Sequence, residues 1–333
     1  MRSNITLAAQ LPTGRSAIDP HGTRSCNAVG NVFDSAVAPP GPLMSSREAV
    51  VPTTVLSVLQ FAPVPGDMQG NAVRIADALS RARCDVAVTP ELCLTGYDVG
   101  DRVHSLAQSV QVGAAVGGLS LPVAGTDVLL GLIEAGAGGP YNSAVALRDG
   151  AVVFRHRKLY LPTYGMFDEG RWFGRGRTLE TWTCHGGWTA GVLICEDLWH
   201  PGLVYVLASR GIDVLFVQAA APGRDVWDGG ARGGFASADV WERIIRTTAQ
   251  LYGIYVALAN RVGIEGGVSF AGGSLIAAPD GSVLARADHA SEDTLTVELS
   301  RAELDRARRP YDHGRDDDAA LVLRELRRTV QPA

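Results

Sequence analysis

The chain has 333 residues, of which 46% are hydrophobic and 20% are charged, and its 30 basic and 35 acidic residues give a net charge of −5. A chain of this length can bury a large hydrophobic core. Because positive charge is not in excess, nucleic acid and anionic membrane surfaces are excluded as main partners.

No apolar stretch approaches the roughly 20 residues that a membrane-spanning helix needs. The short apolar run at residues 5–9 does not suit a secretory signal, so we expect a cytoplasmic protein. The five cysteines are odd in number and scattered, without a CxxC pair. This spacing predicts neither a disulfide framework nor a structural metal site.

Residues 1–50 differ from the rest of the chain. They are rich in Ser, Ala, Asn, Gly and Pro, and they show no helical or strand periodicity. We predict a disordered N-terminal extension at residues 1–50. Met44 stands shortly before the first regular segment, which suggests that translation starts there and that residues 1–43 are missing from the native protein.

The regular part begins with a strand, a helix and a second strand. Residues 55–61 are apolar and β-branched and are followed by prolines, which predicts a buried strand. Over residues 72–82, apolar side chains recur at spacings of three and four, as on one face of a helix. Residues 86–88 form the next strand. A strand, a crossover helix and a strand are typical of an α/β fold.

Further apolar runs alternate with helical segments along the chain. We expect strands at residues 128–133, 144–147, 152–154, 190–194, 214–217 and 255–258. Helices are expected at residues 201–210 and 237–252, and a hairpin at residues 274–287 turns at Asp280. The sequence thus predicts one domain, residues 51–305, with sheets packed face to face and covered by helices, followed by a charged tail, residues 306–333.

Three different polar residues stand where apolar strands end. Glu91 follows residues 86–88, Lys158 follows residues 152–154 closely, and Cys195 ends residues 190–194. Each alone has an ordinary explanation as a surface charge or a small buried hydrophobe. Together they suggest a site, because the crevice beyond strand ends is where α/β folds usually bind ligands.

An acid, a cation and a thiol suffice to cleave an amide. A free thiol needs a base to take its proton, and Glu91 is a candidate for that base. Lys158 and the N–H group after Cys195 could stabilise a developing oxyanion. This chemistry requires no metal and no organic cofactor. A Cys–His hydrolase that uses His185 or His200 is an alternative.

These segments resemble the nitrilase (carbon-nitrogen hydrolase) superfamily over residues 55 to about 300. The motifs that carry the resemblance are TPELCLTGY at 89–97, YNSA at 141–144, RKLYLP at 157–162, LICEDLW at 193–199, ANRVG at 259–263 and FAGGS at 270–274. The resemblance implies an α/β fold built as a four-layer αββα sandwich. It also implies a catalytic triad of Glu91, Lys158 and Cys195, with a second glutamate, Glu169, that orients the substrate amide.

Within the superfamily, residues 161–169 and 195–199 most resemble the glutaminase domains of glutamine-dependent NAD synthetases. Those enzymes continue into an ATP-using domain with an SGGxDS loop, and residues 271–275 do not match that loop. A complete NAD synthetase is therefore not expected.

The function that we predict is hydrolysis of a small carboxamide through a cysteine thioester. The alternatives are a glutaminase subunit that delivers ammonia to a separate synthetase, a nitrilase, and a non-catalytic binding protein. The candidate substrate-binding residues are Tyr97, Tyr164, Phe167, Glu196 and Trp199. The resemblance also predicts a homodimer or higher oligomer.

Overall fold

A computed structural model describes residues 53–116, 124–227, 234–310 and 313–330. The predicted disordered extension at residues 1–50 lies outside these ranges, and so does the proposed start at Met44.

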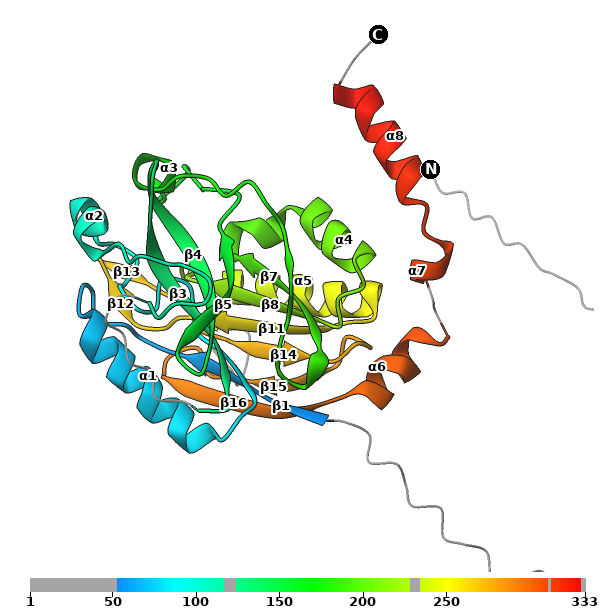
Figure 1. The fold of residues 1–333 in the computed structure, drawn as a ribbon, viewed down its shortest axis with the longest axis horizontal. Helices are drawn as coiled ribbons and strands as arrows, with labels where there is room; N and C mark the ends of the chain where they lie inside the picture. Colours follow the sequence, from blue (N-terminus) through cyan, green and yellow to red (C-terminus); the bar gives the residue numbers. More distant parts are fainter. Residues whose placement is uncertain (1–52, 117–123, 228–233, 311–312, 331–333) are drawn as a thin grey trace, which may run out of the picture. The chain divides into compact units, whose positions relative to one another are not determined.

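One half of the described fold is a mixed six-stranded sheet (Figure 1). Its strands, in spatial order, are β16 (Asp293–Ser300), β1 (Thr53–Gln60), β2 (Val86–Val88), β3 (Asp127–Gly136), β4 (Gly139–Arg148) and β5 (Ala151–Arg157). The pairs β1–β2 and β2–β3 are parallel, and the other neighbours are antiparallel. Since parallel neighbours need a crossover connection, helix α1 (Met68–Ala82) links β1 to β2.

The other half is a second six-stranded sheet. Its strands, in spatial order, are β15 (Val283–Arg286), β14 (Leu275–Ala277), β11 (Tyr255–Asn260), β8 (Val214–Ala219), β7 (Thr189–Ile194) and β6 (Thr181–Thr183). The three central strands are parallel, with helix α4 (Pro201–Ser209) between β7 and β8 and helix α5 (Ala236–Tyr252) between β8 and β11. Every residue of β8 and β11 is buried, as is every residue of β7 except Thr189, as expected for parallel strands covered on both faces.

The alternation of side chains along β1 separates two cores. Leu56 and Val58 belong to the core between the two sheets, which also contains Phe216 of β8. Leu59 points to the opposite face and packs in a second core with Ile75 of α1. Successive residues of a strand face opposite sides of a sheet, so one apolar strand can serve both cores.

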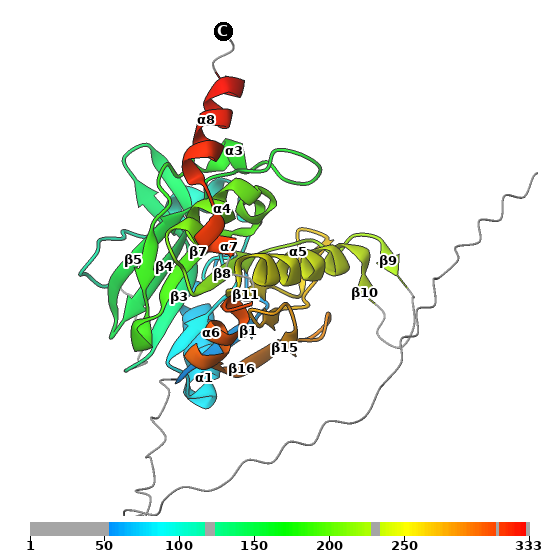
Figure 2. The same cartoon turned by 90° about the vertical axis from the view of Figure 1, so that its right-hand side faces the viewer.

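Helices cover the outer faces of both sheets. Helix α1 packs on the first sheet, and Asp67 caps its N-terminus by accepting a hydrogen bond from the N–H of Gly70 at 3.0 Å. Figure 2 shows α5 along the second sheet, where Ile245 and Ala249 are buried. The order helix, sheet, sheet, helix confirms the predicted αββα sandwich.

Several elements lie outside the predicted set. The strands β6 and β16 lie at sheet edges and contain exposed polar residues. They therefore lack the continuous apolar run by which a buried strand is recognised in a sequence. The shorter elements are β9 (Val226–Trp227), β10 (Gly234–Phe235), β12 (Ile264–Glu265), β13 (Val268–Ser269), α2 (Val103–Leu106), α3 (Glu169–Trp172) and 3₁₀ turns at Gly100–Arg102, His185–Gly187 and Cys195–Trp199.

The C-terminal part contains more helix than a charged tail suggests. Helix α6 (Arg301–Arg308) crosses the predicted boundary at 305, and α7 (His313–Asp316) and α8 (Ala319–Val330) follow. No residue of α8 is buried. The domain boundaries remain predictions. Within the described ranges, no helix has both the length and the apolar character needed to cross a bilayer.

Gly131 is required where β3 passes the turn that carries Glu91. A methyl group on Gly131 would meet the carbonyl oxygen of Pro90 and would lie 2.6 Å from the nitrogen of Leu92. These are backbone atoms that cannot rotate away. We expect Gly131→Ala to lower the free energy of unfolding by about 1–3 kcal/mol in urea denaturation, as overpacking does.

Gly202 in α4 provides the control, because a methyl group there meets no heavy atom within 4 Å. Gly202→Ala should change stability by no more than about 0.5 kcal/mol. Equal stability of the two variants would contradict the close approach at Gly131.

Candidate active site

The three polar residues at strand ends are all buried. Glu91 follows β2 and Lys158 follows β5, both in the first sheet, whereas Cys195 follows β7 in the second sheet. Their residue exposures are 1%, 0% and 7%. Charged side chains are almost never buried to this extent without partners, so their contacts define the site.

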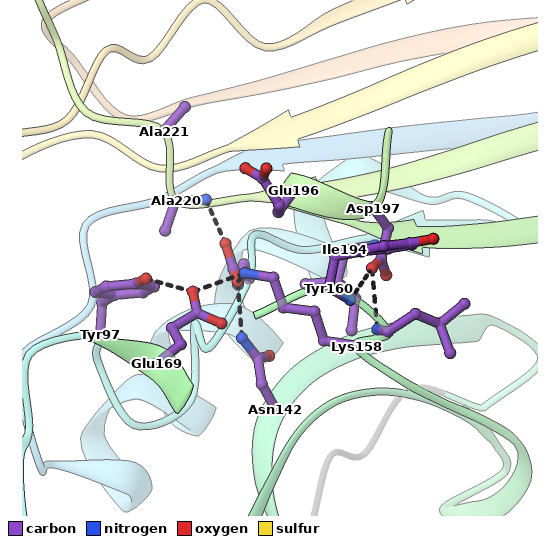
Figure 3. A network of polar contacts seen from close by, with 12 residues as sticks. Tyr97, Asn142, Lys158, Tyr160, Glu169, Ile194, Glu196, Asp197, Ala220 and Ala221 are labelled. Carbon is purple, nitrogen blue, oxygen red and sulfur yellow. Dashed lines mark hydrogen bonds and ion pairs between the residues drawn. The ribbon is translucent and has the colours of Figure 1, made fainter. Parts of the chain in front are cut away.

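The carboxylate of Glu91 is held by three donors. Its Oε1 accepts hydrogen bonds from Lys158 Nζ and from Asn142 Nδ2, both at 2.7 Å. Its Oε2 accepts a hydrogen bond from the backbone N–H of Ala220 at 2.8 Å. Figure 3 labels the three donors, which are Lys158, Asn142 of β4 and Ala220, the residue that directly follows β8. The first sheet and the second sheet therefore both fix this carboxylate.

A second carboxylate contacts the same lysine. Glu169 begins α3, and its Oε1 lies 2.7 Å from Lys158 Nζ and also accepts a hydrogen bond from the hydroxyl of Tyr97 (Figure 3). Its Oε2 is buried and has no hydrogen-bond partner among the described residues. This oxygen is an acceptor that a ligand could use.

One ammonium between two carboxylates leaves the buried cluster with one negative charge in excess. Burial works against the charged form of Lys158, yet Glu169 and Glu91 together hold its pKa well above the usual lysine value. Burial also raises the pKa of Glu169 to about 7, with Glu91 adding to the effect and Lys158 opposing it. With a pKa of about 7, Glu169 changes between its neutral and ionised forms near neutral pH, and its ionised form has, among the described residues, a free acceptor at Oε2.

Cys195 lies within the electric field of this cluster. Burial raises the pKa of its thiol well above the usual value, Glu91 raises it further, and Lys158 lowers it. Its φ of +48° is unusual for a residue other than glycine, and it marks a strained turn at the end of β7. The resting side chain is thus a thiol, which needs a base before it can attack.

The predicted substrate-binding residues differ in their surroundings. The ring of Tyr97 packs edge-on against those of Phe167 and Phe270, each with 6.2 Å between ring centres. The hydroxyl of Tyr164 donates to Glu196 Oε2 at 2.6 Å.

Trp199 is 45% exposed and packs on Trp241 of α5, so its described contacts do not bring it to the buried cluster.

The two histidines near Cys195 in sequence are engaged elsewhere. The ring of His200 stacks on that of Tyr160 at 3.4 Å between centres, and His185 Nε2 lies 3.7 Å from a carboxylate oxygen of Asp85. These contacts give the Cys–His alternative no support.

A cavity of about 210 Å³ borders Glu169 on the side of Tyr97. Aromatic residues line much of it, including Trp172, Phe173 and Phe270. Within residues 53–116, 124–227, 234–310 and 313–330, no three His, Cys, Asp or Glu side chains are grouped as metal ligands would be. Glu169 lines this cavity, whereas Glu91, Lys158 and Cys195 do not, and its size suits a small, partly apolar molecule beside the cluster.

Sequence reasoning missed two groups that hold Glu91. Asn142 belongs to the motif at residues 141–144, and a polar residue in the apolar strand β4 is itself a signal of a functional position. The N–H of Ala220 leaves no trace in the sequence, because every residue except proline has one.

The raised pKa of Glu169 predicts a pH-dependent stability. The folded protein holds the proton up to about pH 7, whereas the unfolded chain releases it near the ordinary value of 4.5. Ionisation therefore favours unfolding, and the wild type should lose stability as the pH rises through this window. Measured by urea denaturation, the free energy of unfolding of the wild type should fall by on the order of 3 kcal/mol between pH 4.5 and 8 because of this group. Glu169→Gln should not show that fall.

Asp168→Asn is the matched control, because the Asp168 side chain is 61% exposed. It should leave the pH dependence of stability as in the wild type. The same slope in the wild type and Glu169→Gln would show that the proton is not held on Glu169.

Comparisons with known proteins agree with this architecture. The family model for carbon-nitrogen hydrolases matches residues 55–309. Over 260 residues the chain is 30% identical to a glutamine-dependent NAD(+) synthetase from Rhodobacter capsulatus. The matched region covers 75% of this chain and 44% of the synthetase. The chain thus spans less than half the length of that relative.

Two further similar proteins are covered over most of their length. The chain is 34% identical over 248 residues to a Pseudomonas protegens protein described as "Hydrolase in pqqF 5′region", covering 71% of this chain and 80% of that protein. The solved structure of a mutant Nesterenkonia AN1 amidase from the nitrilase superfamily matches with a TM-score of 0.60 and 25% identity, covering 78% of this chain and 95% of that one. The resemblance predicted from the motifs is confirmed, and the chain belongs to the carbon-nitrogen hydrolase family.

Proposed function

We propose that this protein is an amidase that hydrolyses a small carboxamide through a thioester on Cys195. The observation that carries the proposal is the buried contact between Glu91 and Lys158, 2.7 Å apart, whose charges both act on the Cys195 thiol. A base, a fixed cation and a nucleophile in one water-poor site are what acyl transfer from an amide requires. The amidase and hydrolase relatives support the same chemistry.

The first half of the reaction forms the thioester. Glu91 takes the thiol proton, and the sulfur of Cys195 bonds to the amide carbon. Lys158 and the N–H of Glu196 hold the oxyanion that develops. The C–N bond then breaks, and the nitrogen leaves as ammonia or an amine with the proton that Glu91 had taken. The ionised form of Glu169 accepts a hydrogen bond from the substrate amide at Oε2, and the lack of a partner for this oxygen among the described residues supports that role.

The second half releases the acid. Glu91 takes a proton from water, whose oxygen bonds to the thioester carbon. The C–S bond then breaks, the carboxylic acid departs, and the proton returns to the sulfur. The cycle ends with the thiol and the Glu91 carboxylate restored, and it consumes only the amide and one water molecule.

Removal of the sulfur should abolish turnover without unfolding the protein. We expect Cys195→Ala to lower kcat at least about 10³-fold in an assay of ammonia release from a panel of amides that includes glutamine. Circular dichroism checks the fold. Cys184→Ala is the matched control, because the Cys184 thiol is also buried and donates to the carbonyl oxygen of Trp188 at 3.5 Å, at the opposite end of β7 from Cys195. Wild-type turnover by Cys195→Ala would exclude the mechanism.

A glutaminase that supplies ammonia to a separate synthetase is the second candidate. The similarity to part of an NAD(+) synthetase supports it. So does the pair of opposite charges beside Tyr164, where Glu196 accepts the Tyr164 hydroxyl and Arg224 lies over the ring of Phe167 at 6.0 Å. A carboxylate and a guanidinium that both act on Tyr164 complement the ammonium and carboxylate groups of an α-amino acid.

This candidate predicts a charge-specific change in binding. Arg224→Met should raise KM for glutamine about tenfold, since it removes one charged contact, and should leave KM for a short uncharged amide unchanged. Steady-state kinetics on both substrates measure this. Equal KM changes for both substrates, or no glutamine turnover with or without a co-purifying ATP-dependent protein, would reject the glutaminase.

A further inference from the structure

Asp197 joins the strand end that carries Lys158 to the strand end that carries Cys195. We propose that Asp197 is a positioning residue, which holds the Lys158 ammonium and the Cys195 sulfur at the spacing that acyl transfer needs. The proposal rests on the proposed function of the site, but it concerns a group that touches none of the reacting atoms.

Both oxygens of this carboxylate are used. Oδ1 accepts hydrogen bonds from the backbone N–H groups of Leu159 at 2.9 Å and Tyr160 at 2.8 Å, the two residues that follow Lys158 (Figure 3). Oδ2 accepts a hydrogen bond at 3.2 Å from the N–H of Ile194, the residue before Cys195. The Asp197 side chain therefore binds the main chain directly after Lys158 and directly before Cys195.

A fourth contact completes the shell of Asp197. Its Oδ2 lies 3.2 Å from Nε2 of His156, and both side chains are buried, with residue exposures of 0% for Asp197 and 3% for His156. A buried carboxylate is unfavourable unless it is fully hydrogen-bonded. Four partners satisfy that condition, and they make the carboxylate a rigid link rather than a mobile charge.

The link lies where the two sheets must be held in register. Lys158 follows β5 of the first sheet, and Cys195 follows β7 of the second. Cys195 also has a φ of +48°, a conformation that persists only when its surroundings impose it. Since a misplacement of about 1 Å can lower a rate about 10²-fold, a fixed link at this point bears directly on catalysis.

The test is Asp197→Asn, which keeps the shape but replaces one acceptor oxygen with an NH₂ group. That group must face a backbone N–H, so at least one end of the link opens. We expect kcat for the amide substrate to fall about 10²-fold while KM changes less than about threefold. The rate at which iodoacetamide alkylates Cys195 at pH 7, followed by peptide mass spectrometry, should fall as well, because Lys158 no longer stabilises the thiolate.

Asp213→Asn is the matched control at the opposite end of β7. Asp213 is also a buried carboxylate; it accepts the N–H of Thr189 at 3.1 Å and pairs with Arg301 at 2.9 Å. We expect a comparable fall in Tm, with kcat and the alkylation rate of the folded protein unchanged. If both variants lose equal activity at matched fractions folded, or if alkylation of Cys195 in Asp197→Asn is unchanged or faster, the positioning role is wrong.

The alkylation rate separates this proposal from the proposed function. It reports on the Lys158–Cys195 arrangement even if the wild type hydrolyses no amide. If Asp197→Asn does not fold, two variants of His156, which contacts the same carboxylate, test the positioning role instead. His156→Leu should slow alkylation about tenfold and His156→Gln should restore it, since glutamine can donate to the same oxygen. Equal rates in the two His156 variants would overturn the proposal.

Discussion

The buried ammonium of Lys158 between the carboxylates of Glu91 and Glu169 is the interaction on which the site depends. Each of these charges would be strongly unfavourable alone in the core, and together they are held by contacts of 2.7 Å. Burial makes these charges unfavourable because it removes them from water. For the same reason it strengthens their electric field at Cys195. The raised pKa keeps the proton on the Cys195 sulfur in the resting protein, and in the proposed mechanism Glu91 takes that proton when a substrate binds.

The fold supplies this cluster from segments far apart in the sequence. Strand ends of both sheets meet at it, and helices on both outer faces keep the strands buried. The main chain contributes as much as the side chains, since the N–H of Ala220 holds Glu91 and the N–H groups beside Lys158 and Cys195 hold Asp197. The proposed chemistry therefore depends on the register between the sheets.

Much of this could be predicted from the sequence because it follows local rules. Buried strands are apolar runs, and a polar residue at or shortly after the end of such a run stands out, which together with the family motifs identifies Glu91, Lys158 and Cys195. The edge strands β6 and β16 do not stand out in the sequence, because exposed or partly exposed polar residues interrupt their buried positions. Residue type alone could not distinguish Tyr97, which contacts Glu169, from Trp199, which packs on Trp241, since only tertiary structure decides which wall an aromatic ring joins.

The most direct test of this account is to trap the acyl-enzyme. The protein is mixed with an amide that it hydrolyses, quenched in acid within the first turnover, and digested for peptide mass spectrometry. The account predicts one acyl group, joined as a thioester to the peptide that contains Cys195 and lost on treatment with hydroxylamine. Ammonia release with the acyl group on another residue, or with no acyl group on any peptide, would contradict it.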